Sequence, residues 1–593
     1  MVGLFQEAGP CEVVEIAQGK FGTQFRQWGW DRSSNIIFVD QPNQVGFSFD
    51  KLTNGSLNLL DSTVELPSSG VPAGQPDYTQ LDGTFSSNNG NSSANTTEIA
   101  AHAMWHMLQG FLASFPQYNP ALTRNNTQIG PVGINLFTES YGGKYGPLFA
   151  AHFESQNALR RSGKLPRNKT LEIRLASLGI MQGCLDDAVQ GRFYPIFANN
   201  NTYGIKALSL ADQQNAASSY LGANGCQQQI QSCRNAVASR DSDNEGDVAS
   251  VNQLCKNAQD SCSRTVIAPY LTSGRSIYDI TQKIPSPFPP STYLEYLNTA
   301  ELQSAIGVAV NYTESNSAIT NAFLQTGDQQ RGDQISQLGY LLSLGVRVAL
   351  IYGDRDYICN WLGGEAVSFA VAAQSPAYSP FYSAGYASIV INSTYVGGMV
   401  RQYGNLSFSR IYDAGHLVPA YQPETAFTVF SRVILGTDLS FGQPVDLSTY
   451  QTNGTANATY TSKAPDSAKP TCWIRNINDT CTDEQREKIV RGEGAIVNGV
   501  LYDKASDWQP PGSSVSVEAG YPGSMPPAMT AAPLQSASPD DAATTTVDVP
   551  TGVYVATATP STSHNGSPSR GVAWDLNVLL CSFAMTMATT YLW

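Results

Sequence analysis

The chain has 593 residues, which is enough for more than one domain and for a large hydrophobic core. Only 14% of its residues are charged, and the formal net charge is −14 at pH 7. This acidic balance argues against binding to nucleic acid, whose phosphates attract basic surfaces, and it suits an acidic extracellular setting.

Apolar runs alternate with stretches of helical spacing, which predicts an α/β fold with a sheet flanked by helices. Polar helices and a cluster of cysteines interrupt this alternation between residues 185 and 296, so we expect an insertion domain there. Residues 302–310 are expected to return to a helix of the core. The predicted strands are 36–39, 134–137, 171–178, 346–352 and 406–411.

The segment around Ser140 has the layout of a nucleophile elbow. An apolar run at 134–137 precedes the serine, two glycines follow it, and a helix-compatible segment continues to Phe153. Such a turn holds a serine Oγ above a sheet, and the backbone N–H of the next residue, Tyr141, is expected to donate to an oxyanion. A serine hydroxyl is a poor nucleophile without a base, so the motif predicts a histidine and an acid farther along.

The chain supplies a candidate for each of these groups. His416 lies where an apolar strand breaks into a loop bounded by Gly and Pro, and Asp356 follows the predicted strand 346–352. The chain order Ser140, Asp356, His416 is typical of α/β-hydrolases and differs from the orders in chymotrypsin-like and subtilisin-like enzymes. The remaining histidines lie in helical segments or in a low-complexity tail: His102, His106, His152 and His564.

His102 and His106 are four residues apart, a spacing that can place two metal ligands on one helix face. No glutamate of the His-Glu-x-x-His kind lies between them, and the helix is amphipathic, so we expect no metal there. The sequence predicts neither a cofactor nor a metal.

Five short blocks resemble those of the serine carboxypeptidase family, in the family's order, and together they cover roughly residues 1–445. The resemblance implies an α/β-hydrolase fold and hydrolysis of the last peptide bond of a polypeptide. The blocks are residues 3–10, 38–48, 139–143 (Glu-Ser-Tyr-Gly-Gly), 353–363 and 415–419.

The resemblance also implies roles for single residues. In the family the second aspartate of an Asp-x-Asp pair belongs to the triad, which assigns Asp356 and leaves Asp354 structural. Glu7 and Glu139 match two glutamates that share a proton and bind the terminal carboxylate of the substrate. Like charges held close together cannot both ionise, so binding should be favoured at acid pH. Cys359 matches a free family thiol near the site that is not the nucleophile.

The chain departs from the family pattern in two places. Thr138 stands where an elbow usually has a glycine that relieves crowding between strand and helix. Family members also carry, before the block at 3–10, an Asn-Gly-Gly-Pro-Gly-type loop that gives the second oxyanion amide. That loop and a signal peptide are missing, so we expect a chain truncated at its N-terminus relative to the family. Two alternatives therefore stay open: an acyltransferase with the same triad, and a truncated member without turnover.

Ten cysteines indicate an oxidising compartment. Cys226, Cys233, Cys255 and Cys262 permit three pairings. Their mirrored spacing suits Cys226–Cys262 around Cys233–Cys255, which is similar to the disulfide-stapled insertion of the family. Zinc is the rival interpretation, but there is no Cys-x-x-Cys motif and no nearby histidine. Further predicted pairs are Cys472–Cys481 and Cys11–Cys184.

The carboxyl end has the pattern of a GPI attachment signal. Small residues around Asn565, a short polar spacer and an apolar tail at 576–593 follow one another. A single-pass anchor is the competing interpretation, but the tail is short and dotted with threonines. This arrangement resembles that of surface-anchored fungal serine carboxypeptidases, and it predicts attachment to a membrane or cell wall.

We expect six segments along the chain. The hydrolase core comprises 1–184 and 297–450, the insertion 185–296, a small extension 451–511, a Ser/Thr/Pro-rich stalk 512–570, and the attachment signal 571–593. In a secreted chain, Asn-x-Ser/Thr sequons are glycosylation candidates. Besides Asn565, these are Asn54, Asn91, Asn95, Asn125, Asn168, Asn200, Asn311, Asn392, Asn405, Asn453, Asn457 and Asn478.

Overall fold

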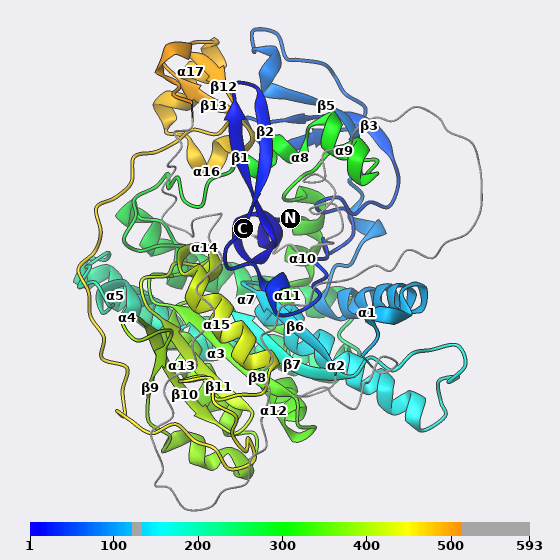
Figure 1. Cartoon of the computed structure of the whole chain (residues 1–593), viewed down its shortest axis with the longest axis vertical. Coiled ribbons are helices and arrows are strands. Elements are labelled where there is room, and N and C mark those ends of the chain that lie inside the picture. Colours follow the sequence, from blue (N-terminus) through cyan, green and yellow to red (C-terminus); the bar gives the residue numbers. More distant parts are fainter. Residues whose placement is uncertain (121–132, 511–593) are drawn as a thin grey trace, which may run out of the picture.

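A six-stranded mixed sheet lies at the centre of the computed structural model, which describes residues 1–120 and 133–510 (Figure 1). The strand order is β6-β7-β8-β11-β10-β9. The pairs β6–β7, β7–β8 and β8–β11 are parallel, whereas β11–β10 and β10–β9 are antiparallel. The strands are β6 (Ile134–Glu139), β7 (Leu175–Met181), β8 (Arg347–Gly353), β9 (Ala387–Val390), β10 (Val396–Tyr403) and β11 (Leu406–Ile411).

Helices cover both faces of the sheet, and all residues of β7, β8 and β11 are buried. Parallel strands covered on both faces are expected to be apolar throughout. On β8, Leu350 and Tyr352 join one core cluster and Ala349 and Ile351 join the other, as the alternation of a strand requires. The first face is covered by α2 (Gly142–Arg161), α12 (Gln334–Ser343) and α13 (Trp361–Ala372), and the second by α15 (Pro423–Ile434).

The segment between β7 and β8 is mostly helical. Disulfides Cys226–Cys262 and Cys233–Cys255 join α6 to α7, in the nested arrangement that the family resemblance implied. The buried guanidinium of Arg331 binds the Asp241 carboxylate at 2.7 Å and ties these helices to the core. The helices are α3 (Asp187–Gln190), α4 (Phe193–Asn199), α5 (Leu210–Leu221), α6 (Cys226–Arg240), α7 (Ala249–Cys262), α8 (Thr292–Leu297), α9 (Ala300–Ile306), α10 (Ser317–Thr326) and α11 (Asp328–Arg331).

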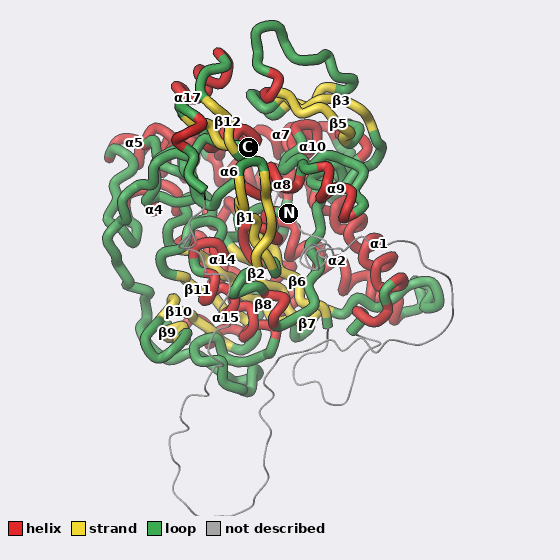
Figure 2. Tube along the Cα trace, turned by 45° about the horizontal axis from the view of Figure 1, so that its top comes forward, coloured by secondary structure: helices red, strands yellow, loops and turns green. Residues whose placement is uncertain are grey.

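Smaller elements gather at one end of the molecule, away from the central sheet (Figures 1 and 2). Leu57 of β3 and Leu59, which follows β3, share a small core with Ile489 and with the disulfide Cys472–Cys481. These elements are β3 (Thr53–Asn58), β4 (Thr63–Glu65), β5 (Gln80–Phe85), α16 (Ile477–Thr480), α17 (Asp483–Arg491), β12 (Ala495–Val497) and β13 (Val500–Tyr502).

The amino-terminal residues pack between this end and the sheet. A short π-helix, Gly3–Ala8, leads into the hairpin of β1 (Cys11–Ala17) and β2 (Lys20–Phe25). Among the described residues, the other α-helices are α1 (Thr97–Ser114), which packs beside α2, and α14 (Val418–Tyr421), which follows His416.

Three predicted strands are confirmed at 134–137, 346–352 and 406–411, and two predictions are wrong in part or whole. Residues 171–174 are not in the strand, because the side-chain amides of Gln109 and Asn157 bind the backbone of Leu171 and Ile173 there. Residues 36–39 form no strand. Their apolar character reflects packing, since Phe38 is buried in the core.

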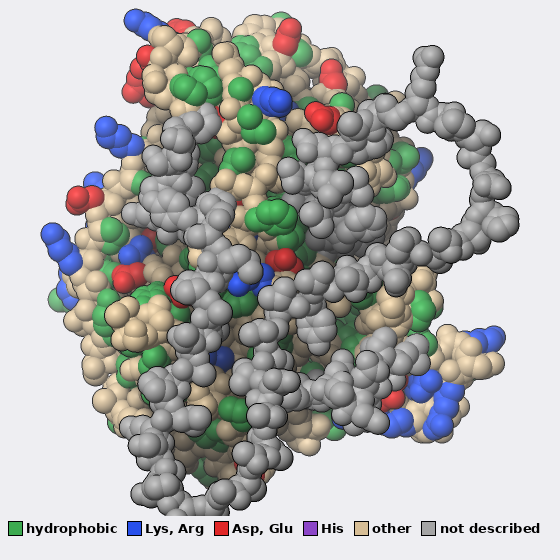
Figure 3. Space-filling view, viewed as in Figure 1, with side chains coloured by type: hydrophobic (Ala, Val, Ile, Leu, Met, Phe, Trp, Pro, Cys, Tyr) green, Lys and Arg blue, Asp and Glu red, His purple; other side chains and the backbone are tan. Residues whose placement is uncertain are grey.

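The surface is sparsely charged, as the composition predicts. The face in Figure 3 carries acidic and basic side chains in small separate groups with uncharged side chains between them. Among the described residues, no helix has the length and apolar character that crossing a membrane requires. The predicted stalk, the attachment signal, Asn125 and Asn565 lie outside the described residues.

The sequon asparagines differ in accessibility. Asn311 and Asn405 are half-buried and hydrogen-bonded, Asn311 accepting from the backbone N–H of Thr84 and Asn405 donating to the Gly345 carbonyl. Asn95 is also half-buried. The exposed sequon asparagines are Asn54, Asn91, Asn168, Asn200, Asn392, Asn453, Asn457 and Asn478.

Candidate active site

The three predicted catalytic residues follow three strands of the parallel part of the sheet, at the edge where those strands end. Ser140 comes directly after β6, Asp356 follows β8, and His416 follows β11. Gln182, at the end of β7, lies between them. Its buried side-chain amide donates to the backbone carbonyls of Gly353 at 3.3 Å and Gly415 at 3.0 Å, which joins the loops after β8 and β11.

Ser140 occupies a strained turn between β6 and α2. Its φ of 58° lies in the left-handed region, which non-glycine residues seldom adopt. The Ser140 carbonyl accepts from the backbone N–H groups of Gly143 at 2.9 Å and Cys184 at 3.1 Å, and the Ser140 N–H donates to the Met181 carbonyl at 3.1 Å. These bonds hold the turn in the shape that an elbow requires.

The threonine at position 138 fits because the helix opposite it presents glycines. A Cβ on Gly142 would lie 2.6 Å from the Thr138 Cβ, and one on Gly146 would lie 2.6 Å from Thr138 Oγ1. The Thr138 hydroxyl donates to the Gly142 carbonyl at 2.9 Å. In the usual elbow a glycine on the strand makes room for the helix. Here glycines on the helix make room for the threonine on the strand.

His416 and Asp356 form a buried pair. His416 Nδ1 lies 2.8 Å from Asp356 Oδ2, and each residue is at most 1% exposed. The Asp356 carboxylate also accepts from the backbone N–H groups of Ile358 and Cys359 at 3.1 and 3.2 Å. Burial raises the pKa of Asp356, and the adjacent His416 and these hydrogen bonds oppose the rise. The arrangement fixes the imidazole with its Nδ1 toward the acid.

Asp354 lies in a separate polar cluster. It accepts from the Tyr203 hydroxyl at 2.7 Å and from the Asp413 backbone N–H at 3.0 Å, and Arg410 lies 3.4 Å away. Burial raises the pKa of Asp354 to about 6, partly offset by Arg410. The bond to Asp413, three residues before His416, holds the histidine loop against the end of β8.

Glu7 lies in the π-helix Gly3–Ala8 and Glu139 is the last residue of β6, and the fold brings these two elements together. Both glutamates are buried, and each lies close enough to the other to influence its pKa. Burial raises the pKa of Glu7 to about 7. Burial and the charge of Glu7 raise the pKa of Glu139 well above its usual range. Two buried carboxyl groups held close together do not both ionise readily, and Glu139 directly precedes Ser140, so the pair lies beside the nucleophile.

Comparison with known proteins assigns the chain to the same family as the five short sequence blocks. Residues 1–436 match the sequence profile of the serine carboxypeptidase family. The chain belongs to that family. It is 38% identical over 527 residues to carboxypeptidase S1 homolog A of Arthroderma otae, covering 87% of this chain and 78% of the relative.

Other fungal carboxypeptidases are also similar. Carboxypeptidase Y homolog of Arthroderma benhamiae is 36% identical, with 84% of this chain and 78% of the relative covered. Carboxypeptidase S1 of Penicillium janthinellum is 30% identical, with 73% and 85% covered. Kex1Δp, a prohormone-processing carboxypeptidase from Saccharomyces cerevisiae of known structure, aligns with a TM-score of 0.45 at 19% identity, covering 73% of this chain and 80% of that one. The chain is a serine-type carboxypeptidase with an α/β-hydrolase fold.

Tyr141 of the carboxypeptidase is anchored by a residue that the sequence did not single out. Its hydroxyl donates to Asp328 Oδ2 at 2.5 Å. Asp328 also accepts from the backbone N–H and the hydroxyl of Thr97, at 2.7 and 2.6 Å, in the first turn of α1. Asp328 thus fixes the residue whose backbone N–H is the candidate oxyanion donor. No local pattern in the sequence links the two residues, because Asp328 lies at the start of α11, 187 positions after Tyr141.

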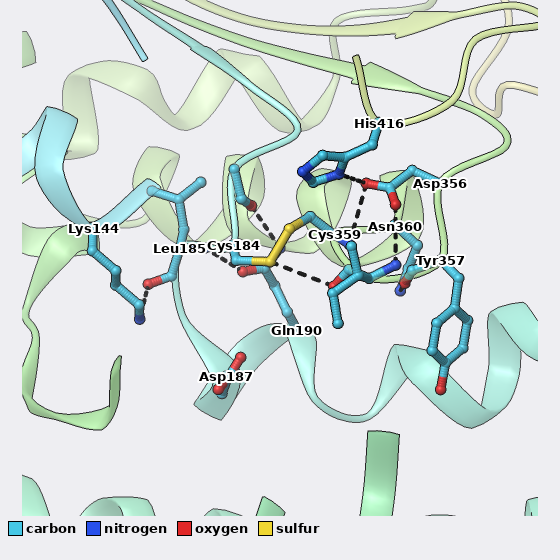
Figure 4. Close-up of a disulfide and its surroundings, with 12 residues drawn as sticks. Lys144, Cys184, Leu185, Asp187, Gln190, Asp356, Tyr357, Cys359, Asn360 and His416 are labelled. Atoms are coloured by element: carbon cyan, nitrogen blue, oxygen red, sulfur yellow. Dashed lines mark hydrogen bonds and ion pairs between the residues drawn. A yellow bond between two sulfur atoms is a disulfide. The ribbon is translucent and has the colours of Figure 1, made fainter. Parts of the chain in front are cut away.

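Two sequence-based expectations about cysteines are wrong. Cys359 is not a free thiol, because it is bonded to Cys184, and Cys184 therefore does not pair with Cys11 (Figure 4). Cys184 follows β7 and Cys359 follows β8, so the two come off neighbouring strands at the same edge. That adjacency was a usable signal. The disulfide joins the loop that binds the Ser140 carbonyl to the loop that carries Asp356.

The disulfide also bears on metal binding at the triad. Asp356, Cys359 and His416 lie close enough together to hold an ion. The Cys359 sulfur is consumed in its bond to Cys184, so it offers no thiolate, and His416 Nδ1 is occupied by Asp356. This group is suited to proton transfer rather than to metal coordination.

The fit between Thr138 and α2 predicts a rescue experiment. Gly146→Ala places a Cβ against Thr138 Oγ1 and should cost about 1–3 kcal/mol of stability. Because the elbow shifts with the helix, kcat/KM should fall by roughly tenfold or more. Adding Thr138→Gly removes the obstructing atom and should restore most of both, measured by thermal unfolding and peptidase kinetics.

A matched control is Gly110→Ala in α1, where nothing lies within 4 Å of the new Cβ. It should stabilise the helix by about 0.5–1 kcal/mol and leave kcat/KM unchanged. If Thr138→Gly rescues neither property of Gly146→Ala, the explanation for the threonine is wrong.

The Cys184–Cys359 bond predicts a loss of activity beyond the loss of stability. Its residues are separated by 175 positions, so chain entropy gives about 5 kcal/mol for this cross-link, against about 2.5 kcal/mol for Cys472–Cys481 with a separation of 9. Replacing both Cys184 and Cys359 by alanine should lower the Tm and should also lower kcat, by up to about 100-fold, because two catalytic loops lose their tether. Replacing Cys472 and Cys481 should lower the Tm alone. Equal kcat values in the two double variants would contradict a role in the site.

Proposed function

We propose that the carboxypeptidase is secreted and removes C-terminal amino acids from peptides at acid pH, through an acyl-enzyme on Ser140. The observation that carries this proposal is the buried 2.8 Å contact between Asp356 and His416, at the sheet edge where Ser140 occupies its elbow. Belonging to the serine carboxypeptidase family supports the peptide substrate.

The proposed steps follow from the contact between Asp356 and His416 and from the place of Ser140 in its elbow. Because Asp356 holds Nδ1, His416 uses Nε2 to take the proton of Ser140 as Oγ attacks the carbonyl of the last peptide bond. The backbone N–H of Tyr141, fixed through Asp328, donates to the oxyanion. Collapse breaks the C–N bond, and His416 gives its proton to the leaving amino acid. Water, deprotonated by His416, then releases the peptide from Ser140.

Selection of the chain end is assigned to the glutamate pair. A carboxyl group that keeps its proton can donate a hydrogen bond to the terminal carboxylate of the substrate, whereas two ionised glutamates would repel it. Burial of Glu7 and Glu139 supports a retained proton at acid pH. The pair lies next to Ser140, which suits an enzyme that cleaves one residue from the end.

Secretion is supported by the disulfides and by the exposed sequons. The described residues contain the bonds Cys184–Cys359, Cys226–Cys262, Cys233–Cys255 and Cys472–Cys481, and such bonds persist in oxidising compartments. The exposed sequon asparagines are the proposed glycan carriers. GPI attachment at Asn565, and with it a location at the cell surface, stays a prediction from the sequence.

The triad assignment predicts large, specific losses. Ser140→Ala should lower kcat for an N-blocked dipeptide by about 10⁴–10⁶-fold, and Asp356→Asn by about 10⁴-fold, because the asparagine favours the wrong tautomer of His416. Asp354→Asn is the matched control, since Asp354 bonds to Tyr203 and Arg410 instead. It should change stability more than kcat. Activity of Ser140→Ala close to that of the unmodified enzyme would refute the mechanism, and acyl transfer without hydrolysis would favour the acyltransferase alternative.

The glutamate pair predicts a pH dependence confined to substrates with a free carboxylate. Glu7 loses its proton as pH rises through about 7, and the charge on Glu7 raises the pKa of Glu139, which keeps the remaining proton to higher pH. KM for an N-blocked dipeptide should therefore rise above pH 7, because the pair gains negative charge and repels the terminal carboxylate. KM for the corresponding dipeptide amide should not follow this curve. Glu139→Gln keeps an uncharged donor and should flatten it. Identical pH profiles for the acid and the amide would contradict the assignment.

The same pair links folding to pH. The folded pKa of Glu7 exceeds its ordinary value of 4.5, so above that pH the folded protein holds more protons than the unfolded chain. Its contribution to stability is therefore present below about pH 4.5 and is lost as pH rises toward 7. Thermal unfolding measured between pH 4.5 and pH 7 should show a Tm that falls as pH rises. The fall should be less steep in Glu139→Gln.

A further inference from the structure

Three possible metal ligands meet between α1 and α2, away from the triad. Glu98 and His102 lie one turn apart on α1, and His152 reaches them from α2. One Glu98 oxygen lies 3.4 Å from His102 Nε2 and 3.8 Å from His152 Nδ1. The three ligand atoms all lie within 4.8 Å of one another. His106, the partner considered for His102 on sequence spacing, instead packs its ring against Trp105.

The donor set suits zinc. Two imidazole nitrogens and a carboxylate oxygen are a common ligand set for that ion, with bonds of about 2.0–2.2 Å. Two ligands of a tetrahedral ion with such bonds lie about 3.4 Å apart. The Glu98–His102 distance already has this value, and the Glu98–His152 distance exceeds it by a few tenths of an ångström. The two imidazole nitrogens lie within 4.8 Å of each other, so rotation of the partly exposed His102 side chain toward His152 would complete the geometry.

The side chains of Glu98, His102 and His152 differ in their exposure to solvent. The His152 side chain is 9% exposed and that of Glu98 is 23%, while that of His102 is 41% exposed. An ion can enter from the His102 side, and a fourth position is open to water there. The imidazole rings of His102 and His152, with centroids 4.6 Å apart, stand close enough to flank one ion.

We propose that Glu98, His102 and His152 form a binding site for a divalent transition metal of the zinc class, which links α1 to α2. The first turn of α1 already contacts the catalytic region, because Thr97 and Tyr141 share the Asp328 carboxylate. The ion adds a second link between the same two helices. It stabilises their packing and takes no part in peptide hydrolysis.

Titration of the purified, EDTA-treated full-length protein with Co²⁺ and with Zn²⁺ at pH 7.5 tests the site, because imidazole ligands must be unprotonated to bind. We expect one equivalent of Co²⁺ to give the visible absorption of a tetrahedral complex, which Zn²⁺ abolishes. Zinc at 100 times its Kd should raise the Tm by about 2–5 °C, and EDTA should reverse the rise.

Variants locate the ion. His152→Ala should weaken binding by at least about 100-fold, and Glu98→Gln, which keeps the side-chain shape, should weaken it by about 10–100-fold. His106→Ala, an exposed histidine on the same helix, should leave affinity unchanged. All three variants should keep normal peptidase activity, so the test is independent of the proposed mechanism. Absence of a stoichiometric Co²⁺ complex would overturn the proposal, as would equal affinity in the His152→Ala and His106→Ala variants. In either case the cluster would be an ion pair of Glu98 with its two histidines.

Discussion

The carboxyl ends of β6, β7, β8 and β11 meet at one edge of the sheet, and this constraint decides where every catalytic group of the carboxypeptidase can lie. Strands buried on both faces cannot shift register without moving apolar side chains out of the core. The positions from which the loops leave the sheet are therefore fixed. Ser140, Asp356 and His416 are far apart along the chain, but each lies within a few residues of such a position.

The loops need additional links, and the structure provides them at three levels. The Gln182 amide joins the loops after β8 and β11, Asp354 holds the backbone of Asp413, and Cys184–Cys359 joins the nucleophile side to the acid side. Each link binds backbone or sulfur atoms next to a catalytic residue.

The sequence predicts the parts of this site that depend on local pattern. Long buried runs predicted β8 and β11, and the motifs directly after β6, β8 and β11 predicted the triad, whereas the glutamate pair was implied only by the family resemblance. Contacts between distant loops leave no local pattern, which is why the Cys184–Cys359 bond and the role of Asp328 could not be read from periodicity. The strands β9 and β10 were missed because β9, at the sheet edge, has only four residues, and because Gly397 and Gly398 interrupt the apolar run of β10.

Several features of the site lower the stability of the folded protein. A non-glycine residue with positive φ, two buried glutamates and two buried aspartates lie within the same region. The glycines of α2 illustrate how such costs are accommodated, since Gly142 and Gly146 leave the space that Thr138 occupies. Substitutions around the elbow should therefore be strongly coupled rather than additive.

A crystal structure of the enzyme after reaction with a peptidyl phosphonate tests the central claim most directly. The account predicts phosphorus bonded to Ser140 Oγ, His416 Nε2 within hydrogen-bonding distance of that oxygen, and a phosphonyl oxygen accepting from the Tyr141 N–H. An adduct on another residue, or a His416 ring turned away from Ser140 while Asp356 stays in place, would contradict it.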